Sequence, residues 1–122
     1  DAVALNKLAI MYNEGMGGSK NIMKAIELYT KATTQGSVQA EVNLGQIYVE
    51  GKDVPQDYKI AAEWFQKAAD HGFMPAQYYV GIMYVNGKGV TKDNKKAVEW
   101  FQKAADQGSA EAKEAISKIQ QN

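Results

Sequence analysis

The sequence repeats itself every 36 residues, and this period constrains the fold more than any other feature. Residues 38–73 match residues 74–109 at 19 of 36 positions, whereas residues 2–37 match residues 38–73 at 10. A period of this length is typical of stacked structural repeats. Residues that recur in all three repeats include Tyr12, Tyr48 and Tyr84; Gly15, Gly51 and Gly87; Ala25, Ala61 and Ala97; Lys31, Lys67 and Lys103; and Gly36, Gly72 and Gly108.

Each repeat is predicted to form two helices. In the first helix, Ala40, Leu44 and Ile47 follow the i, i+4, i+7 spacing of a buried stripe. Gly51 follows this stripe and supplies a left-handed stop. The second helix is expected to begin after a residue whose short side-chain oxygen can cap free amides. The aligned residues at that position are Asn21, Asp57 and Asp93.

Small residues at one aligned helix position predict a close approach between the two helices of each repeat. Gly in a helix costs about 1 kcal/mol against Ala, so its recurrence suggests a steric reason. The residues concerned are Ala9, Gly45 and Gly81, which are expected to face Ala25, Ala61 and Ala97. The aromatic residues Trp64, Phe65, Trp100 and Phe101 are expected to fill the space between successive helix pairs.

The composition argues against several classes of function. The 14 basic residues balance 14 acidic ones, so the positive charge typical of nucleic-acid or membrane-surface proteins is missing. Without cysteine the chain has no disulfide, thiolate nucleophile or Cys-based metal site. His71, the single histidine, excludes a two-His metal site within the chain and is expected at a helix C-terminus. The longest apolar run, Tyr78–Val85, is far shorter than the roughly 20 residues of a membrane span.

No catalytic constellation can be assembled from the sequence. The serines lack the Gly-x-Ser-x-Gly and Ser-x-x-Lys contexts. Lys88 lies between glycines, but the spacing of a phosphate-binding loop is missing. Glu27, Glu63 and Glu99 recur at one position and are expected to pair with the lysine four residues later. We therefore predict no enzymatic activity, no cofactor and no metal.

The third repeat carries the most complete motif. It reads Ala76, then Gly81-x-x-Tyr84-x-x-Gly87-x-Gly89-Val90-x-x-Asp93-x-x-Lys96-Ala97-x-x-Trp100-Phe101-x-Lys103-Ala104-Ala105-x-x-Gly108. This pattern resembles the Sel1-like repeat family, a subfamily of tetratricopeptide-type α-solenoids. The second repeat matches it nearly as well. The first repeat departs from it at Gly18, Asn21 and Leu28.

The period and the resemblance together predict an all-α fold: an α/α superhelix, or solenoid, of three 36-residue helix-turn-helix repeats plus a C-terminal capping helix. We expect one domain over residues 1–122, with repeats at about 2–37, 38–73 and 74–109 and the capping helix at 110–122. The polar outer face of that last helix favours a cap at which the array ends. Residue 1 is Asp, which suggests that the chain was processed or cut from a longer protein.

The resemblance implies an adaptor that presents a concave surface to partner proteins. It favours a periplasmic or secreted location and leaves a cytoplasmic one open. Some relatives carry paired cysteines within their repeats, and this part of the resemblance does not transfer to a chain without cysteine. We expect a protein or peptide partner, no nucleic acid, no membrane insertion and a monomeric chain.

By family analogy, the first helices line the concave side, so their variable positions are candidates for partner binding. They are Asn6, Ile10 and Asn13 in the first repeat; Gln39, Val42, Gln46, Val49 and Glu50 in the second; and Tyr78, Ile82, Val85 and Asn86 in the third. The third first-helix is apolar all round, whereas a surface helix keeps a polar face. Val42, Val49, Tyr78, Ile82 and Val85 are therefore interpreted either as an apolar stripe that docks a peptide or as residues buried by solenoid curvature.

Two other functions remain open at this point. The chain could be an architectural segment of a longer array, in which the repeats only hold other parts apart. It could also bind a small ligand or a cell-wall fragment, to which Gln46 and Asn86 would contribute. A small-ligand site needs a deep pocket with converging polar groups.

Overall fold

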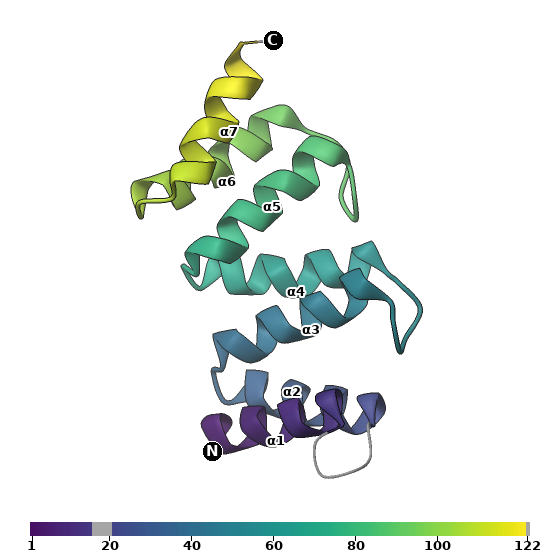
Figure 1. Cartoon of the computed structure of the whole chain (residues 1–122). Coiled ribbons are helices and arrows are strands. Elements are labelled where there is room, and N and C mark those ends of the chain that lie inside the picture. The colour runs from purple at the N-terminus through teal and green to yellow at the C-terminus, as the bar shows by residue number, and fades with distance from the viewer. Residues whose placement is uncertain (16–20, 122) are drawn as a thin grey trace.

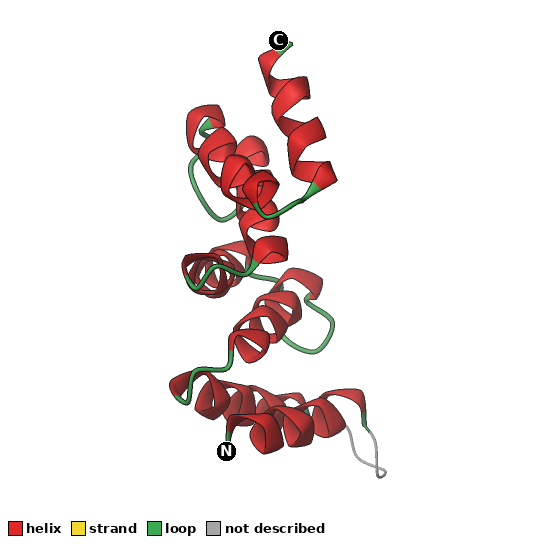
Figure 2. Cartoon of the chain, turned by 90° about the vertical axis from the view of Figure 1, so that its left-hand side faces the viewer, coloured by secondary structure: helices red, strands yellow, loops and turns green. Residues whose placement is uncertain are grey.

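The computed structural model describes residues 1–15 and 21–121, and the described residues contain helices and connecting turns but no strand. Gly18, one of the positions at which the first repeat departs from the motif, lies outside them. The helices stack into an elongated column, with the N-terminus at one end and the C-terminus at the other (Figures 1 and 2). The all-α solenoid predicted from the repeat is confirmed. The helices are α1 (Ala2–Glu14), α2 (Ile22–Thr34), α3 (Val38–Glu50), α4 (Tyr58–Asp70), α5 (Met74–Asn86), α6 (Asn94–Asp106) and α7 (Ala110–Gln120).

The second helix of each repeat begins where its capping residue predicts. The side chains of Asn21, Asp57 and Asp93 each accept a hydrogen bond, 3.0 Å long, from the amide three residues ahead. The backbone amides of the same residues donate to the carbonyl oxygens of Tyr12, Tyr48 and Tyr84 at 2.9 to 3.0 Å. Each capping residue therefore starts one helix and ties it to the last turns of the previous one.

Glycine ends the first helix of each repeat, as predicted. Gly15, Gly51 and Gly87 have φ angles of 74°, 61° and 68°. This left-handed backbone is strained for residues with a Cβ atom. Their amides donate back to the carbonyl oxygen four residues earlier, which closes the last turn.

The core of each repeat is an aromatic ring that lies against the first helix. The fully buried rings of Phe65 and Phe101 come from α4 and α6. A Cβ atom on Gly45 would lie 2.8 Å from the Phe65 ring, and one on Gly81 would lie 2.6 Å from the Phe101 ring. The aromatic ring is therefore the steric reason for these glycines. The expectation that they also face Ala61 and Ala97 stays a prediction.

The two tryptophans are half-buried between successive helix pairs, as expected: Trp64 packs against the core formed by α1, α2 and α3, and Trp100 against the core formed by α4 and α5. A lysine ammonium lies over each ring, Lys67 at 4.6 Å and Lys103 at 4.2 Å from the ring centroid. These cation–π contacts occupy the lysines that were expected to pair with Glu63 and Glu99.

The expected Glu–Lys pair forms in the first repeat, where Lys31 lies 3.5 Å from Glu27. There Leu28 takes the place of tryptophan, so no indole ring competes for the lysine. The residue that follows the repeated glutamate, leucine or tryptophan, thus decides whether the lysine pairs with the glutamate or lies over an indole ring.

We expect Gly45→Ala to destabilise the chain because the new methyl group overlaps the Phe65 ring. Overpacking of this kind costs about 1–3 kcal/mol, whereas the gain in helix propensity is about 1 kcal/mol. In a Phe65→Leu background the same Gly45→Ala change should become neutral or stabilising. Chemical denaturation of the parent chain, the two single variants and the double variant measures the change in the free energy of unfolding. If Gly45→Ala still destabilises the chain in the Phe65→Leu background, the steric explanation is contradicted.

Candidate functional site

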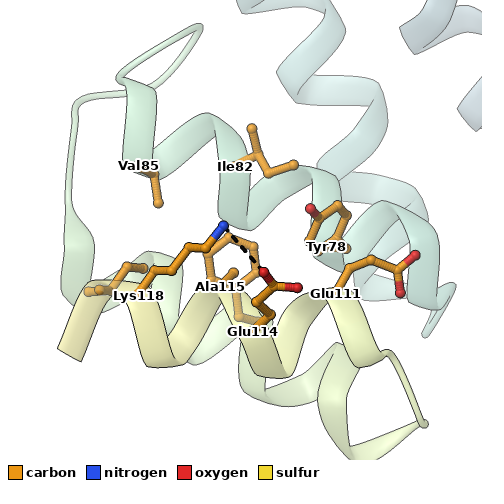
Figure 3. Close-up of a pocket in the computed structure, with 9 residues that line it drawn as sticks. Tyr78, Ile82, Val85, Glu111, Glu114, Ala115 and Lys118 are labelled. Atoms are coloured by element: carbon orange, nitrogen blue, oxygen red, sulfur yellow. Dashed lines mark ion pairs between the residues drawn. The ribbon is translucent and has the colours of Figure 1, made fainter. Parts of the chain in front are cut away.

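The first groove lies between α5 and α7 and has a volume of about 320 Å³ (Figure 3). Its floor is apolar, and its rim on α7 is charged. The ammonium of Lys118 lies 3.3 Å from the Glu114 carboxylate on this rim. The groove is lined by Tyr78, Ile82 and Val85 of α5, Phe101 of α6, and Glu111, Glu114, Ala115, Lys118 and Ile119 of α7.

The apolar character of α5 has two explanations, one for each of its faces. Ala76, Val80 and Met83 are buried in the core of the column. Tyr78, Ile82 and Val85 are half-buried and pack against the core of the last repeat while still lining the groove. Solenoid packing therefore covers the second face only in part.

The second groove lies between α1 and α3 and has a volume of about 570 Å³. Carboxamides and carboxylates dominate its lining, and the lining residues that the structure describes include no Lys, Arg or His. Ile10, Val42 and Ile47 provide its apolar part. The polar lining residues are Asn13, Glu14, Tyr29, Gln39, Asn43, Gln46 and Glu50.

A chain of side-chain hydrogen bonds organises part of this polar groove. Gln39 Nε2 donates to Asn43 Oδ1 at 3.1 Å, and Asn43 Nδ2 donates to Asn6 Oδ1 at 3.4 Å. Asn43 also hydrogen-bonds Tyr29, whose fully buried ring occupies the position that Phe65 and Phe101 hold in later repeats. Burial, followed by the charge of Glu14, raises the pKa of Tyr29 to about 12, although the Asn43 hydrogen bond opposes this shift.

The structure separates the predicted binding residues into these two grooves. Tyr78, Ile82 and Val85 line the α5–α7 groove. Asn6 reaches the α1–α3 groove through Asn43, whereas Val49 and Asn86 line neither groove. The remaining predicted residues, Ile10, Asn13, Gln39, Val42, Gln46 and Glu50, line the α1–α3 groove. Their role in binding stays a prediction.

Sequence reasoning missed two kinds of groove residue. Glu111, Glu114 and Lys118 belong to the exposed polar face of the capping helix, and the structure shows that they also line the α5–α7 groove (Figure 3). Glu14 and Asn43 were passed over although their register places them beside predicted positions. Grouping residues 13, 14, 43, 46 and 50 by helical face would have identified the second set.

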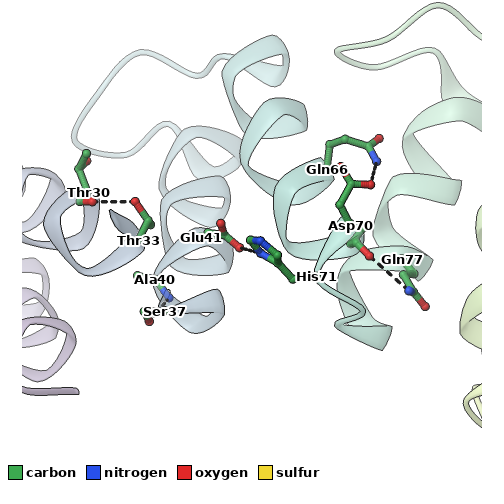
Figure 4. A network of polar contacts seen from close by, with 10 residues as sticks. Thr30, Thr33, Ser37, Ala40, Glu41, Gln66, Asp70, His71 and Gln77 are labelled. Atoms are coloured by element: carbon green, nitrogen blue, oxygen red, sulfur yellow. Dashed lines mark hydrogen bonds and ion pairs between the residues drawn. The ribbon is translucent and has the colours of Figure 1, made fainter. Parts of the chain in front are cut away.

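A polar joint connects the start of α3 to the end of α4, and no sequence pattern predicts it. His71 ends α4 as expected, and its Nδ1 donates to Glu41 Oε1 at 2.9 Å (Figure 4). Glu41 lies in the first turn of α3, and its side chain is only 5 % exposed. A buried carboxylate needs such a partner because an unsatisfied one is costly.

The next repeat makes the same joint with different residues. Gln77 and Gln107 stand 36 residues after Glu41 and His71, and Gln107 Nε2 donates to Gln77 Oε1 at 2.8 Å. Gln77 Nε2 also donates to the Ala69 carbonyl at 3.3 Å, and Gln107 to the Gly72 carbonyl at 2.9 Å. The glutamines therefore connect α5 and the end of α6 to the end of α4 and the turn that follows it (Figure 4 shows Gln77).

The described residues contain no group of His, Cys, Asp or Glu side chains that could hold a metal ion. None of their helices has the length and apolarity needed to cross a membrane.

Stacked helix pairs with a constant period define the class of α-solenoid repeat proteins. Within this class, the family model described as the Sel1 repeat matches residues 2–37, 38–73 and 75–109. The chain belongs to the Sel1 repeat family. Sel1 repeats generally form non-catalytic protein-interaction scaffolds. A search among curated proteins finds no significant match.

Several solved structures share this fold. A Sel1 repeat protein from Oxalobacter formigenes is 36% identical with a TM-score of 0.85, over 97% of this chain and 89% of that one. The protective antigen c5321 of uropathogenic Escherichia coli, which displays an SLR fold, is 36% identical with a TM-score of 0.88, over 97% of this chain and 25% of that one. Cysteine-rich protein B of Helicobacter pylori is 28% identical with a TM-score of 0.71, over 91% of this chain and 93% of that one.

Replacing His71 with Ala should leave the buried Glu41 carboxylate without its hydrogen-bond partner. We expect the free energy of unfolding to fall by about 1–3 kcal/mol. The double variant Glu41→Gln/His71→Gln recreates the joint of the following repeat and should recover at least half of this loss. Denaturant titration of both variants measures the free energy of unfolding. A loss below about 0.5 kcal/mol in His71→Ala, as for an ordinary surface substitution, would contradict a stabilising role of the joint.

The raised pKa of Tyr29 predicts a loss of stability in alkaline solution. The ordinary tyrosine pKa is 10.0, against about 12 in the folded chain. The neutral phenol is therefore favoured by folding, and its full contribution is present below pH 10 and is lost as the pH rises to 12. A two-unit shift corresponds to about 2–3 kcal/mol. Stability measured against pH should fall less steeply in Tyr29→Phe, and equal slopes would contradict the prediction.

Proposed function

We propose that this chain is a protein-interaction scaffold that binds a partner protein or peptide on the face formed by the first helices, α1, α3 and α5. The α5–α7 groove is the observation that carries the proposal. Its floor offers Tyr78, Ile82 and Val85 to an apolar side chain without requiring the core to open. Aromatic and aliphatic side chains at the centre of a concave surface are typical binding anchors.

The test is a selection of displayed peptides on the immobilised chain, followed by affinity measurement of the selected peptides. Tyr78→Ala removes the largest side chain of the groove floor, so affinity should fall about tenfold or more, as at a binding hot spot. Met23→Ala is the matched control because Met23 is exposed on α2, in the first repeat. It removes an exposed apolar side chain and should leave affinity unchanged.

Tyr78 also contacts the Phe101 ring at a centroid distance of 5.6 Å, so its replacement affects packing. Glu111→Arg provides a second variant, because Glu111 is an exposed rim residue. It should alter peptide selection, whereas the reversed charge at the N-terminus of α7 should lower the free energy of unfolding by only about 1 kcal/mol. Selected peptides that bind all these variants equally well would contradict a site in this groove.

An exposed apolar stripe on α1 favours a second candidate, an architectural segment of a longer array. Leu8 and Met11 are 41% and 43% exposed, whereas Leu44 and Ile47, at the same positions of the next repeat, are 0% and 7% exposed. This stripe is suited to stacking against another repeat. If stacking is the sole role, selection should yield no peptide specific for the grooves.

A further inference from the structure

We infer that the α1–α3 groove binds an extended peptide segment that carries Lys or Arg side chains. This inference rests on the proposed function and names the chemistry of one partner. It is argued from charge complementarity, from the hydrogen-bonding capacity of the groove, and from the contrast with the apolar α5–α7 groove.

The described lining of the groove is negatively charged. Glu14 and Glu50 are exposed lining residues, and no basic residue among the described ones lines the groove with them. They are the last residues of α1 and α3, whose C-terminal ends lie on the same side of the column (Figure 1). The negative ends of both helix dipoles therefore add to the two carboxylates.

The effect of this charge reaches the groove floor. The Glu14 carboxylate contributes, after burial, to the raised pKa of the Tyr29 phenol that lines the floor. A cation placed in the groove would be attracted by the same charge. Since the charged rim is exposed, this attraction is moderate and should weaken with salt.

The carboxamides favour an extended backbone over a helix. Gln46 and Asn13 line the groove and make no side-chain hydrogen bond with the rest of the described chain. A carboxamide offers one acceptor and two donors, which match the N–H and C=O groups of a peptide bond. A helix has already paired these groups within itself, whereas an extended segment still needs partners for them.

The rest of the floor is ordered before a ligand arrives. Asn43 is held between Gln39 and Asn6 and bonded to Tyr29, so it fixes the polar part of the floor. Ile10 and Val42 add an apolar strip beside it. An alternating peptide can place one side chain on this strip and the next toward the carboxylates, because successive side chains of an extended chain point to opposite sides.

The test uses two blocked peptides, one of alternating Thr and Lys and one of alternating Thr and Glu, titrated into the isotope-labelled chain. Amide resonances of α1 and α3 should shift with the Thr-Lys peptide and stay in place with the Thr-Glu peptide. Binding should weaken strongly in about 1 M salt, where the screening length falls to about 3 Å.

Two double variants with equal net charge identify the carboxylates responsible. Glu14→Gln/Glu50→Gln should weaken binding about three- to tenfold, the range for two exposed ion pairs. Glu63→Gln/Glu99→Gln removes two exposed carboxylates of α4 and α6 and should leave affinity unchanged. Gln46→Ala should weaken binding without changing its salt dependence.

Absent shifts in α1 and α3, shifts confined to α7, or equal weakening by both double variants would overturn the inference. The peptide selection on the α5–α7 groove is independent of this titration. If the selection yields peptides that bind the α5–α7 groove and the titration shows no binding in the α1–α3 groove, the proposed function stands and only the inference of a cationic peptide is overturned.

Discussion

The packing of an aromatic ring against a helix position without a Cβ atom sets the geometry of the repeat. The Phe65 ring occupies the space that a side chain at Gly45 would need, and Phe101 and Gly81 repeat this arrangement one unit later. The contact lets the two helices of a repeat approach closely and buries a large apolar surface at a constant separation. The first repeat solves the same problem with Ala9 and Tyr29, and Tyr29 then needs a hydrogen-bond partner for its hydroxyl group.

Contacts between repeats depend on that arrangement. Phe65 also stacks on Tyr79 of the next repeat, with ring centroids 4.5 Å apart. One ring therefore packs both within its own repeat and against the following repeat. The joint of Glu41 and His71 connects two helices of the second repeat, and Gln77 and Gln107 make the equivalent joint in the third. Buried polar pairs need complementary partners. The pair can therefore change from Glu–His to Gln–Gln when both members change together.

This division of labour explains why the first helices can diversify. Ala40 and Leu44 are buried within the stack, whereas positions between and after them, such as Val42, Asn43 and Gln46, line a groove. The result is a constant scaffold with two grooves of different chemistry, one mainly apolar and one rich in carboxamides and carboxylates. The proposed role therefore depends on the shape of the grooves and on the side chains that line them, because one fold can carry many different binding sites.

The sequence by itself determined the period, the fold class, the helix boundaries and the glycine stops, because these depend on residues within a few positions of one another. Asp57 starts α4 through an amide three residues away, and Gly51 ends α3 through a carbonyl four residues back. Only the tertiary structure decided which residues meet at long range. The joint of Glu41 and His71 spans 30 residues, and the α5–α7 groove exists because α7 packs mainly against α6 and leaves a space beside α5. The half-buried tryptophans follow the same rule, since the burial of a residue depends on the neighbours that surround it and not on its position in a repeat.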